Sequence, residues 1–279
     1  MVDVQDENNP AESPEMIKPA CCDTFVVKKK KLGVEYFSLT FGPFSKIRAC
    51  RPGHFIQLKL PDSQVFFRRP MSVAGVIPQN SEMEIVLKVV GRGTSSMSRL
   101  KKGDPVNILG PLGIPFKLPH RNESAVLVAG GVGVPPLLFL AETMISKGFD
   151  PEKILFYYGG RTSADIILRS RIKSLGVRFS PVTEDGSYGI EGIVTEPLEK
   201  MLNGAKGEKL RLYACGPEGM LKAINNLGLK YGVDGQISLE ALMPCGIGVC
   251  LGCVVPLTEG GHARVCTEGP VFDIGKVAL

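Results

Sequence analysis

Short segments in which hydrophobic and polar residues alternate dominate the chain from Thr24 to about Leu118. Turn signals such as Pro52-Gly53 separate these segments. We predict strands there that include residues 36–41, 54–60 and 84–90. Several short strands at this spacing are typical of a small antiparallel β barrel.

The pattern changes near Ser124, where predicted strands and helices begin to alternate. Residues 125–129 form a continuous apolar strand, and the segment after Gly133 has a helical pattern as far as Lys147. Further strands are predicted at 154–158, 177–182 and 210–214, and further helices at 164–175, 195–202 and 217–227. Apolar strands that alternate with helices are typical of a parallel sheet covered on both faces. The fold class that we predict is therefore a β barrel followed by an α/β domain.

The length of 279 residues suits two compact domains with a small appendage. We predict a flexible tail at 1–20, a barrel domain at 21–120, an α/β domain at 121–236 and a small segment at 237–279. The tail is acidic and rich in proline, so little of it can be buried. The last segment is rich in glycine and cysteine and is too short to form a core of its own.

The charge and the apolar runs limit the classes of function. The formal net charge of +5 is small and dispersed, which argues against a nucleic-acid-binding protein. The basic run at 28–31 is interpreted as the end of a strand with lysines in solvent. The longest apolar run, 126–140, is interrupted by glycine and proline and is unsuited to spanning a membrane. Because no secretory signal opens the chain, we expect a soluble, cytoplasmic protein.

Half of the eight cysteines lie in one short segment, with the spacing C-x4-C-x2-C-x12-C. They are Cys245, Cys250, Cys253 and Cys266. The first three match the arrangement that binds plant-type [2Fe–2S] clusters, and the intervening glycines let a loop wrap around a cluster with its N–H groups inward. A structural zinc site with four cysteine ligands is the alternative. Zinc knuckles use two CxxC pairs, and only Cys250 and Cys253 form one, so the spacing favours iron–sulfur.

Glycine-containing turns follow two strands of the predicted parallel sheet. Gly131 and Gly133 lie between a strand and a helix, where backbone N–H groups and the helix dipole suit a pyrophosphate. This signal is weak alone, because the third glycine of the Rossmann pattern is missing. Cys215, Gly216 and Pro217 form a second such turn, and we expect Cys215 near a nicotinamide without a covalent role. Since parallel strands end at one edge of a sheet, both turns predict one nucleotide-binding crevice.

The barrel region contains a second pair of candidate phosphate-binding features. The run Arg69-Pro70-Met71-Ser72 supplies an Arg for a pyrophosphate and a Ser that can hydrogen-bond the edge of a flavin ring. Gly93 and Thr94 begin a short helix that offers another anion site. Without the other signals, Arg69 would be interpreted as a solvent-exposed residue before a strand.

Together and in this order, these motifs resemble the ferredoxin–NADP reductase superfamily. Residues 238–250 and 265–272 narrow the resemblance to the electron-transfer subunits of two-subunit, NAD-dependent (type B) dihydroorotate dehydrogenases. The resemblance extends from about residue 24 to residue 272. It implies a [2Fe–2S] cluster on the four cysteines and an FAD site. The residues carried over to FAD are Arg69, Pro70, Met71, Ser72, Val86, Leu87, Lys88, Gly93 and Thr94.

The resemblance also implies a division of labour between two proteins. NAD(H) exchanges two electrons with FAD, and the cluster carries electrons one at a time. Dihydroorotate is oxidised at the FMN of a separate catalytic subunit, in a complex expected to hold two copies of each subunit. The pathway implied is de novo pyrimidine (UMP) biosynthesis.

The sequence leaves two other functions open. One is a reductase subunit for ferredoxin, polysulfide or hydrogenase chemistry, with the same cofactors and a different partner. The other is a non-catalytic nucleotide-binding module with a structural zinc. NAD and NADP are not separated either, because Arg161 could meet a 2′-phosphate or be an ordinary surface residue.

Overall fold

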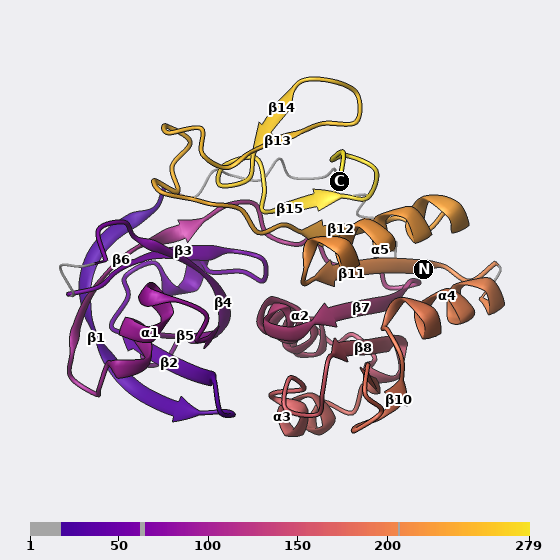
Figure 1. Cartoon of the computed structure of the whole chain (residues 1–279), viewed down its shortest axis with the longest axis horizontal. Coiled ribbons are helices and arrows are strands. Elements are labelled where there is room, and N and C mark those ends of the chain that lie inside the picture. Colours follow the sequence, from indigo (N-terminus) through magenta and orange to yellow (C-terminus); the bar gives the residue numbers. More distant parts are fainter. Residues whose placement is uncertain (1–17, 62–64, 206) are drawn as a thin grey trace, which may run out of the picture.

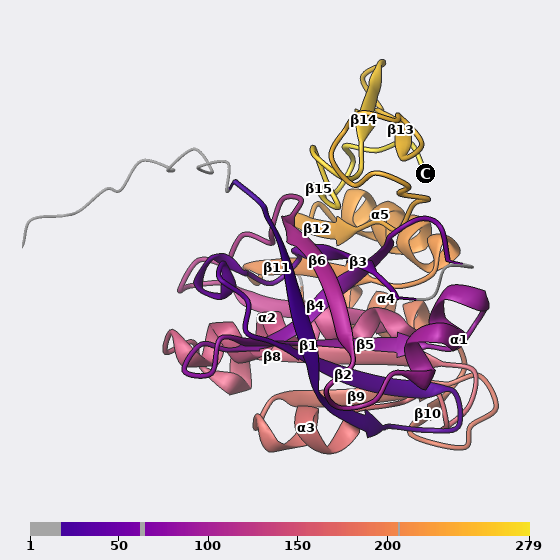
Figure 2. The ribbon, with the colours of Figure 1, turned by 90° about the vertical axis from the view of Figure 1, so that its left-hand side faces the viewer.

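The computed structural model of the chain describes residues 18–61, 65–205 and 207–279. A β barrel and an α/β domain lie side by side, and a C-terminal segment projects from one side of the pair (Figures 1 and 2). Of the predicted tail at 1–20, residues 1–17 lie outside the described residues, and β1 already begins at Ala20.

Six antiparallel strands form the closed barrel, in the order β1-β2-β5-β4-β3-β6. Its elements are β1 (Ala20–Lys31), β2 (Tyr36–Gly42), η1 (Ile47–Ala49), β3 (Phe55–Lys59), β4 (Arg69–Ile77), β5 (Glu82–Lys88), α1 (Arg92–Arg99) and β6 (Pro105–Leu112). Alternate side chains such as Leu39 and Phe41 of β2 are completely buried inside the barrel. Successive side chains of a strand point alternately into the barrel and away from it, and the predicted barrel is confirmed.

The α/β domain is built on a seven-stranded sheet with the order β10-β9-β8-β7-β11-β12-β15. Its strands are β7 (Ser124–Gly130), β8 (Ile154–Gly160), β9 (Arg178–Thr183), β10 (Ile190–Glu191), β11 (Leu210–Cys215), β12 (Gly235–Ser238) and β15 (Val271–Asp273). Its helices are η2 (Gly131–Gly133), α2 (Val134–Ser146), η3 (Pro151–Lys153), α3 (Arg169–Ser174), α4 (Thr195–Gly204) and α5 (Glu218–Tyr231). All neighbouring strands are parallel except the pair β12 and β15.

Both faces of this sheet are covered, which explains why its central strands, such as β7 and β8, are mostly apolar. On β7, Leu127 belongs to the core formed with α2 and α3, whereas Val126 and Val128 belong to the core formed with α4 and α5. Each of these side chains is fully buried, and such burial stabilises the fold by about 1.5–3 kcal/mol per side chain. The predicted parallel sheet with two covered faces is confirmed.

One helix is shorter than the sequence pattern predicts. We predict a helix at 164–175, but α3 begins only at Arg169. Leu168 has a φ of +56°, which lies in the left-handed region and interrupts the helix. Just before it, Ile166 and Ile167 enter the apolar core as a turn, so tertiary packing overrides the local helical pattern.

The C-terminal segment is joined to both domains. β15 pairs with β12 and thereby covers an edge of the sheet of the α/β domain, and the predicted boundary at 236/237 lies inside β12. On the barrel side, the Ile114 N–H donates to the Gly269 carbonyl oxygen at 2.6 Å. The hairpin of β13 (Val254–Pro256) and β14 (His262–Arg264) extends away from the rest of the molecule (Figure 2).

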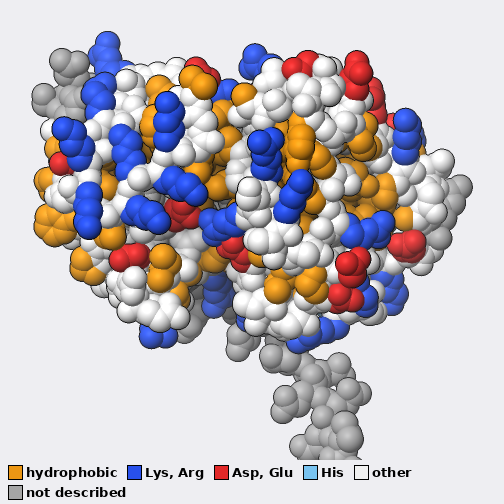
Figure 3. Space-filling view, turned by 90° about the horizontal axis from the view of Figure 1, so that it is seen from below, with side chains coloured by type: hydrophobic (Ala, Val, Ile, Leu, Met, Phe, Trp, Pro, Cys, Tyr) orange, Lys and Arg blue, Asp and Glu red, His pale blue; other side chains and the backbone are white. Residues whose placement is uncertain are grey.

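Charged side chains of both signs meet along the junction of the two domains on the face shown in Figure 3. Arg171 of α3 donates to Glu84 of β5 at 2.8 Å, which joins the α/β domain to the barrel. The same guanidinium donates to both oxygens of Glu142 on α2, at 2.5 and 2.7 Å. No helix among the described residues is long and apolar enough to cross a membrane.

Candidate functional site

The four cluster cysteines are brought together as two pairs. Cys245 and Cys250 lie in the loop after β12, close enough for the Cys250 thiol to lower the pKa of Cys245. Cys253 precedes β13 and lies against Cys266, which follows β14. Cys253 and Cys266 are buried, Cys245 is half-buried and Cys250 is exposed. One pair therefore faces the protein interior and the other faces solvent.

Backbone N–H groups surround these sulfur atoms. The Gly248 N–H donates to the Cys266 Sγ at 3.2 Å, and the Gly252 N–H donates to the Cys250 Sγ at 3.5 Å. Gly246 and Gly248 have φ values of +73° and +78°, which glycine adopts without strain. The loop can turn its N–H groups toward the sulfurs because glycine stands at these positions.

The N–H donors also change the acidity of one thiol. Burial raises the pKa of Cys245, but N–H groups of Ile247, Cys250 and Val249 and the Cys250 thiol outweigh it and lower the pKa to about 6. Hydrogen bonds to a thiolate favour the charged form, which is the form that binds metal. At neutral pH, Cys245 is therefore prepared to act as a ligand.

The arrangement of the four thiols in two pairs is compatible with a [2Fe–2S] cluster. Among the described side chains, no three of His, Cys, Asp or Glu converge on a point where they could hold one metal ion. A structural zinc needs all four thiolates in one tetrahedron. A [2Fe–2S] cluster instead shares four thiolates between two irons, and two neighbouring pairs of thiols can meet that requirement.

A fully buried glutamine ties the cluster loop to the barrel. Gln57 of β3 donates from Nε2 to the Met243 carbonyl oxygen at 2.7 Å, just before Cys245. The Gln57 side chain packs so closely on Gly246 that a Cβ there would lie 2.6 Å from it. The backbone of Gln57 pairs with Pro70 of β4. One residue therefore contacts both the cluster loop and the strand of the predicted FAD motif.

The predicted FAD residues gather on β4, β5 and the start of α1. The Arg69 side chain lies directly over Gly93, where an added Cβ would be 2.3 Å from Nε. The Thr94 hydroxyl accepts the Gly91 N–H at 3.2 Å and fixes the start of α1. A guanidinium beside a helix N-terminus suits a pyrophosphate. Glycine at position 93 leaves room for the Arg69 side chain in this position, and the arrangement is compatible with the pyrophosphate site that we predict.

The other members of this set differ in what they can offer a cofactor. Pro70, Met71 and Ser72 follow Arg69 along β4 and are not fully buried, so their side chains are accessible. Leu87 is 1% exposed and belongs to the barrel core, so only its backbone can contact a cofactor. Val86 is also buried, whereas Lys88 reaches the edge of the neighbouring pocket.

A pocket of about 550 Å³ opens at the carboxyl ends of the parallel strands, beside the barrel. Gly131, Gly133, Gly216 and Pro217 line it, as the sequence predicts. The two glycine turns touch, because a Cβ on Gly133 would lie 2.3 Å from the Cys215 carbonyl oxygen. The Cys215 side chain does not line the pocket, and complete burial raises the pKa of its thiol to about 12.

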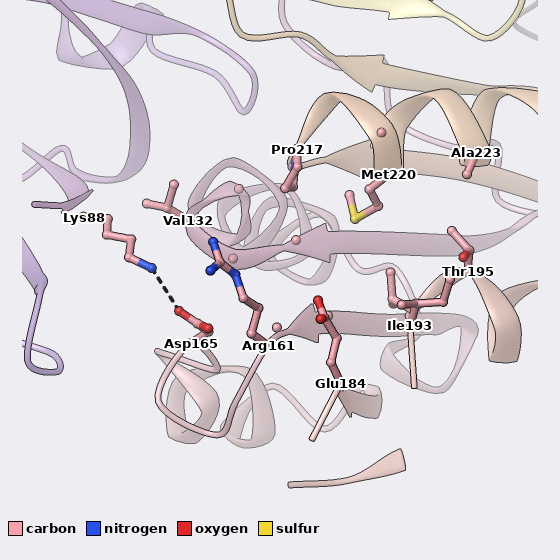
Figure 4. A pocket seen from close by; sticks show the side chains of 18 of the residues that line it. Lys88, Val132, Arg161, Asp165, Glu184, Ile193, Thr195, Pro217, Met220 and Ala223 are labelled. Carbon is pink, nitrogen blue, oxygen red and sulfur yellow. Dashed lines mark hydrogen bonds and ion pairs between the residues drawn. The ribbon is translucent and has the colours of Figure 1, made fainter. Parts of the chain in front are cut away.

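A polar contact between the domains closes the barrel side of this pocket. The Asp165 carboxylate accepts hydrogen bonds from the Tyr36 hydroxyl at 2.6 Å and from the Lys88 ammonium at 3.1 Å (Figure 4). Burial raises the pKa of Asp165, but these two donors outweigh it and lower the pKa below its ordinary value. Tyr36 and Lys88 come from the barrel and Asp165 from the α/β domain, so this contact fixes the relative position of the two walls.

The sequence did not predict several residues that line the pocket. They include Tyr36, Asp165, Glu184, Thr195, Met220 and Glu240. Arg161, which the sequence left undecided, also lines it. Glu184 directly follows β9 at the carboxyl edge of the sheet, and this position alone could have marked it as a candidate.

Comparison with known proteins agrees with this geometry. Residues 240–278 match the iron-sulfur cluster binding domain of dihydroorotate dehydrogenase B, and residues 127–226 match the oxidoreductase NAD-binding domain. The electron transfer subunit of dihydroorotate dehydrogenase B (NAD(+)) from Streptococcus pneumoniae is 34% identical over 258 residues, which cover 91% of this chain and 97% of that protein. The chain belongs to this family of electron transfer subunits. The Lysinibacillus sphaericus member is 35% identical, with the same shares of both chains covered.

Solved structures show the same fold beyond the family. The structure of an NADH-dependent reduced ferredoxin-NADP oxidoreductase, described for flavin-based electron bifurcation, superimposes with a TM-score of 0.81. It is 29% identical and covers 91% of this chain and 89% of that chain. A ferredoxin NADP+ reductase from Neisseria gonorrhoeae has a TM-score of 0.65 at 20% identity, over 76% of this chain and 92% of that chain, and shows the fold alone.

Proposed function

We propose that this chain carries electrons from the FMN of a dihydroorotate dehydrogenase catalytic subunit to NAD+, through a [2Fe–2S] cluster and FAD, in pyrimidine biosynthesis. The observation that carries the proposal is that one chain of this family contains four cysteines in two neighbouring pairs and also a nucleotide pocket. We assign residues 21–120 to FAD, 121–236 to NAD and 237–279 to the cluster. We place the reaction in the cytoplasm.

The thiolates of Cys245, Cys250, Cys253 and Cys266 are the proposed cluster ligands. When bound, the cluster supplies one-electron transfer, which connects carriers of single electrons to carriers of pairs. The N–H groups of Gly248 and Gly252 stabilise negative charge on the sulfurs. Burial of the inner pair, Cys253 and Cys266, keeps water from that side of the site.

For FAD, we propose that Arg69 holds the pyrophosphate together with the start of α1 at Gly93 and Thr94. Ser72 is accessible and offers a hydroxyl to the ring, while Pro70 and Met71 lie between it and Arg69 on the same strand. We propose that Val86 and Leu87 contact FAD through the backbone of β5, and that Lys88 contacts it through its ammonium group. When bound, FAD exchanges electrons in pairs with NAD and singly with the cluster.

The nucleotide pocket is proposed to hold NAD(H) between its glycine turns. Gly131 and Gly133 present N–H groups at the start of α2, and Gly216 and Pro217 form the facing wall at the start of α5. The close approach of Gly133 to Cys215 shapes this crevice, since a side chain there would separate the two turns. Cys215 is proposed to support the nicotinamide end from behind this wall.

An apolar surface around the outer cysteine pair suits a protein partner. Leu242, Ile247, Val249 and Leu251 are between 49% and 84% exposed and flank Cys245 and Cys250 along the chain. Exposed apolar groups of this kind mark interaction surfaces. We propose that the FMN-containing catalytic subunit covers them in a complex of two plus two subunits, which places its FMN near the outer pair.

The decisive experiment reconstitutes the two subunits from separately purified proteins. Alone, this chain should pass electrons from NADH to an artificial acceptor and leave dihydroorotate unchanged. With the catalytic subunit it should form NADH from dihydroorotate and NAD+, and Cys250→Ser should abolish this coupling, whereas Cys50→Ser should not. Failure of the two wild-type proteins to bind each other or to form NADH would refute the assignment.

A second candidate is favoured by the likeness to the NADH-dependent reduced ferredoxin-NADP oxidoreductase. In this alternative, the same cofactors serve a reductase with a different partner. Reduction of NAD+ by reduced ferredoxin, without any response to the dihydroorotate dehydrogenase catalytic subunit, would favour it.

A further inference from the structure

A fully buried glutamine, Gln57, lies between the barrel and the loop at the start of the proposed cluster site. It belongs to β3, on the side of the barrel that faces the C-terminal segment (Figures 1 and 2). Its neighbours Ile56 and Leu58 point into the barrel core, so the Gln57 side chain points outward, toward the cluster loop. Its exposed fraction is nevertheless 0%, because that loop packs on it.

The Gln57 carboxamide holds the chain on both sides of Cys245. Its Nε2 donates to the Met243 carbonyl oxygen at 2.7 Å, two residues before Cys245. Directly after Cys245, a Cβ on Gly246 would lie 2.6 Å from the Gln57 Cγ and 2.7 Å from its Nε2. One side chain of the barrel therefore contacts the backbone before and after a proposed cluster ligand.

The other polar atom of this amide has no partner. Within the described residues, the Gln57 Oε1 is buried and accepts no hydrogen bond. Turning the amide over would not supply one, because it would place Oε1 against the Met243 carbonyl oxygen. A methionine side chain has a similar length and no oxygen to bury, so packing alone does not explain the amide. The N–H that Gln57 donates to Met243 is the contact that an apolar side chain could not supply.

The position of the Met243 carbonyl group depends on this hydrogen bond. Met243 is 7% exposed, and in the parts of the chain that the structure describes its carbonyl oxygen accepts from no other donor. A buried carbonyl group without a donor destabilises the conformation that buries it. Without the Gln57 amide, the chain would therefore shift until another donor or water reached this oxygen, and Cys245 would shift with it.

Such a shift would disturb the backbone N–H groups that follow Cys245. The N–H groups of Ile247 and Val249 stabilise the Cys245 thiolate. The Gly248 N–H donates to the Cys266 Sγ at 3.2 Å. Hydrogen bonds to the sulfurs help to set the reduction potential of an iron–sulfur cluster, because they favour its reduced, more negative form. A residue that anchors this loop therefore influences the potential.

We propose that Gln57 is a positioning residue that holds the cluster loop with its N–H groups toward the sulfurs and thereby raises the reduction potential of the [2Fe–2S] cluster. The inference rests on the proposed function in one respect, namely that the four cysteines bind this cluster. Among the described residues, no hydrogen bond joins the Gln57 side chain to a cluster cysteine, so it acts through the backbone on either side of Cys245.

The test is a redox titration of the full chain loaded with its cofactors, followed by the electron paramagnetic resonance signal of the reduced cluster. Gln57→Met keeps the length of the side chain and removes the donor. At the wild-type midpoint potential, its ratio of reduced to oxidised cluster should fall about tenfold, which is a shift of about 59 mV to lower potential. The g values of the signal should also change, while iron and acid-labile sulfide per chain stay at the wild-type level.

Gln236→Met is the matched control. Gln236 is 3% exposed, and its amide accepts the Lys117 N–H at 2.8 Å and donates to the Asp273 carboxylate at 2.9 Å. Because these contacts do not involve the cluster loop, the midpoint potential of this variant should equal that of the wild type. Gln57→Asn keeps the amide but is one carbon shorter, so it should also lower the potential, and it supplies the measurement if Gln57→Met does not retain the cluster.

An unchanged potential in a Gln57 variant that retains its cluster, or an equal fall in Gln236→Met, would overturn the inference while the proposed function stands. Loss of the cluster from both Gln57 variants, with Gln236→Met intact, would also overturn it, because Gln57 would then be required for cluster binding rather than for the potential. If the wild-type protein binds no iron and sulfide, the proposed function itself fails, and this inference fails with it.

Discussion

Replacing Arg171 with Met should loosen the attachment of the α/β domain to the barrel. The guanidinium binds Glu84 of the barrel and both oxygens of Glu142, and the three side chains are between 23% and 31% exposed. A hydrogen bond to a charged group contributes about 1.5–3 kcal/mol to stability. Because the Arg171–Glu84 and Arg171–Glu142 pairs are partly exposed, the contribution of each pair should lie toward the lower end of this range. Because the substitution also leaves two carboxylates near each other without a cation, we expect a loss of about 2–4 kcal/mol in the free energy of unfolding.

Urea unfolding followed by far-UV circular dichroism measures this loss. With an m-value of about 3 kcal/mol per M, the midpoint should fall by about 1 M. Arg169→Met is the matched control: Arg169 lies on the same helix and is exposed, and its guanidinium lies over the Tyr188 ring, 5.1 Å from the ring centroid. Adding Glu142→Gln to Arg171→Met should recover part of the loss, because it removes one of the uncompensated charges. Equal midpoints for Arg171→Met and Arg169→Met would refute the reasoning.

Three further predictions concern the cofactors and pH. Cys266→Ser should abolish the stoichiometric binding of iron and acid-labile sulfide, measured in anaerobically purified protein, whereas Cys50→Ser should keep both. Zinc in place of iron in the wild-type protein would contradict the cluster assignment. Arg69→Ala should weaken FAD binding by about ten- to a hundredfold, measured as flavin retained on dialysis, because one charge-assisted contact is lost; full retention would show that another residue anchors the pyrophosphate. The folded-state pKa of Asp165 is lowered, so its bonds stabilise the protein above the ordinary value of 3.8 and are lost as pH falls through the lowered value. The stability advantage of wild type over Asp165→Asn should therefore be constant from about pH 6 to pH 5 and shrink toward pH 3. Urea unfolding midpoints measure this difference, and a difference that stays constant down to pH 3 would argue against the ionised contact.

The barrel, the covered sheet and the iron-sulfur binding segment could be predicted because each leaves a local pattern. Alternation marks a barrel strand, a continuous apolar run marks a doubly covered strand, and the spacing of four cysteines survives as a motif. The contacts that complete the sites leave no such pattern. Tyr36 and Asp165 are 129 residues apart, and Gln57 and Met243 are 186 residues apart. Only the folded chain brings these groups together.

The short α3 shows the same limit at a smaller scale. Its sequence has a helical pattern from residue 164. Ile166 and Ile167 nevertheless lie in a turn, because there their side chains are buried in the apolar core. Glu184 is a different case, because the rule that ligands bind at the carboxyl ends of parallel strands could have found it.

The attachment of the C-terminal segment to both domains has a consequence for the speed of electron transfer. Electron tunnelling slows steeply as the gap between two carriers widens, so a carrier on a freely hinged arm would conduct only intermittently. Here Gln57 joins the cluster loop to the strand that carries the predicted flavin motif. At the same time, β15 pairs with β12 at the edge of the sheet of the α/β domain. These contacts therefore fix the distance between the residues proposed to hold the cluster and those proposed to hold FAD.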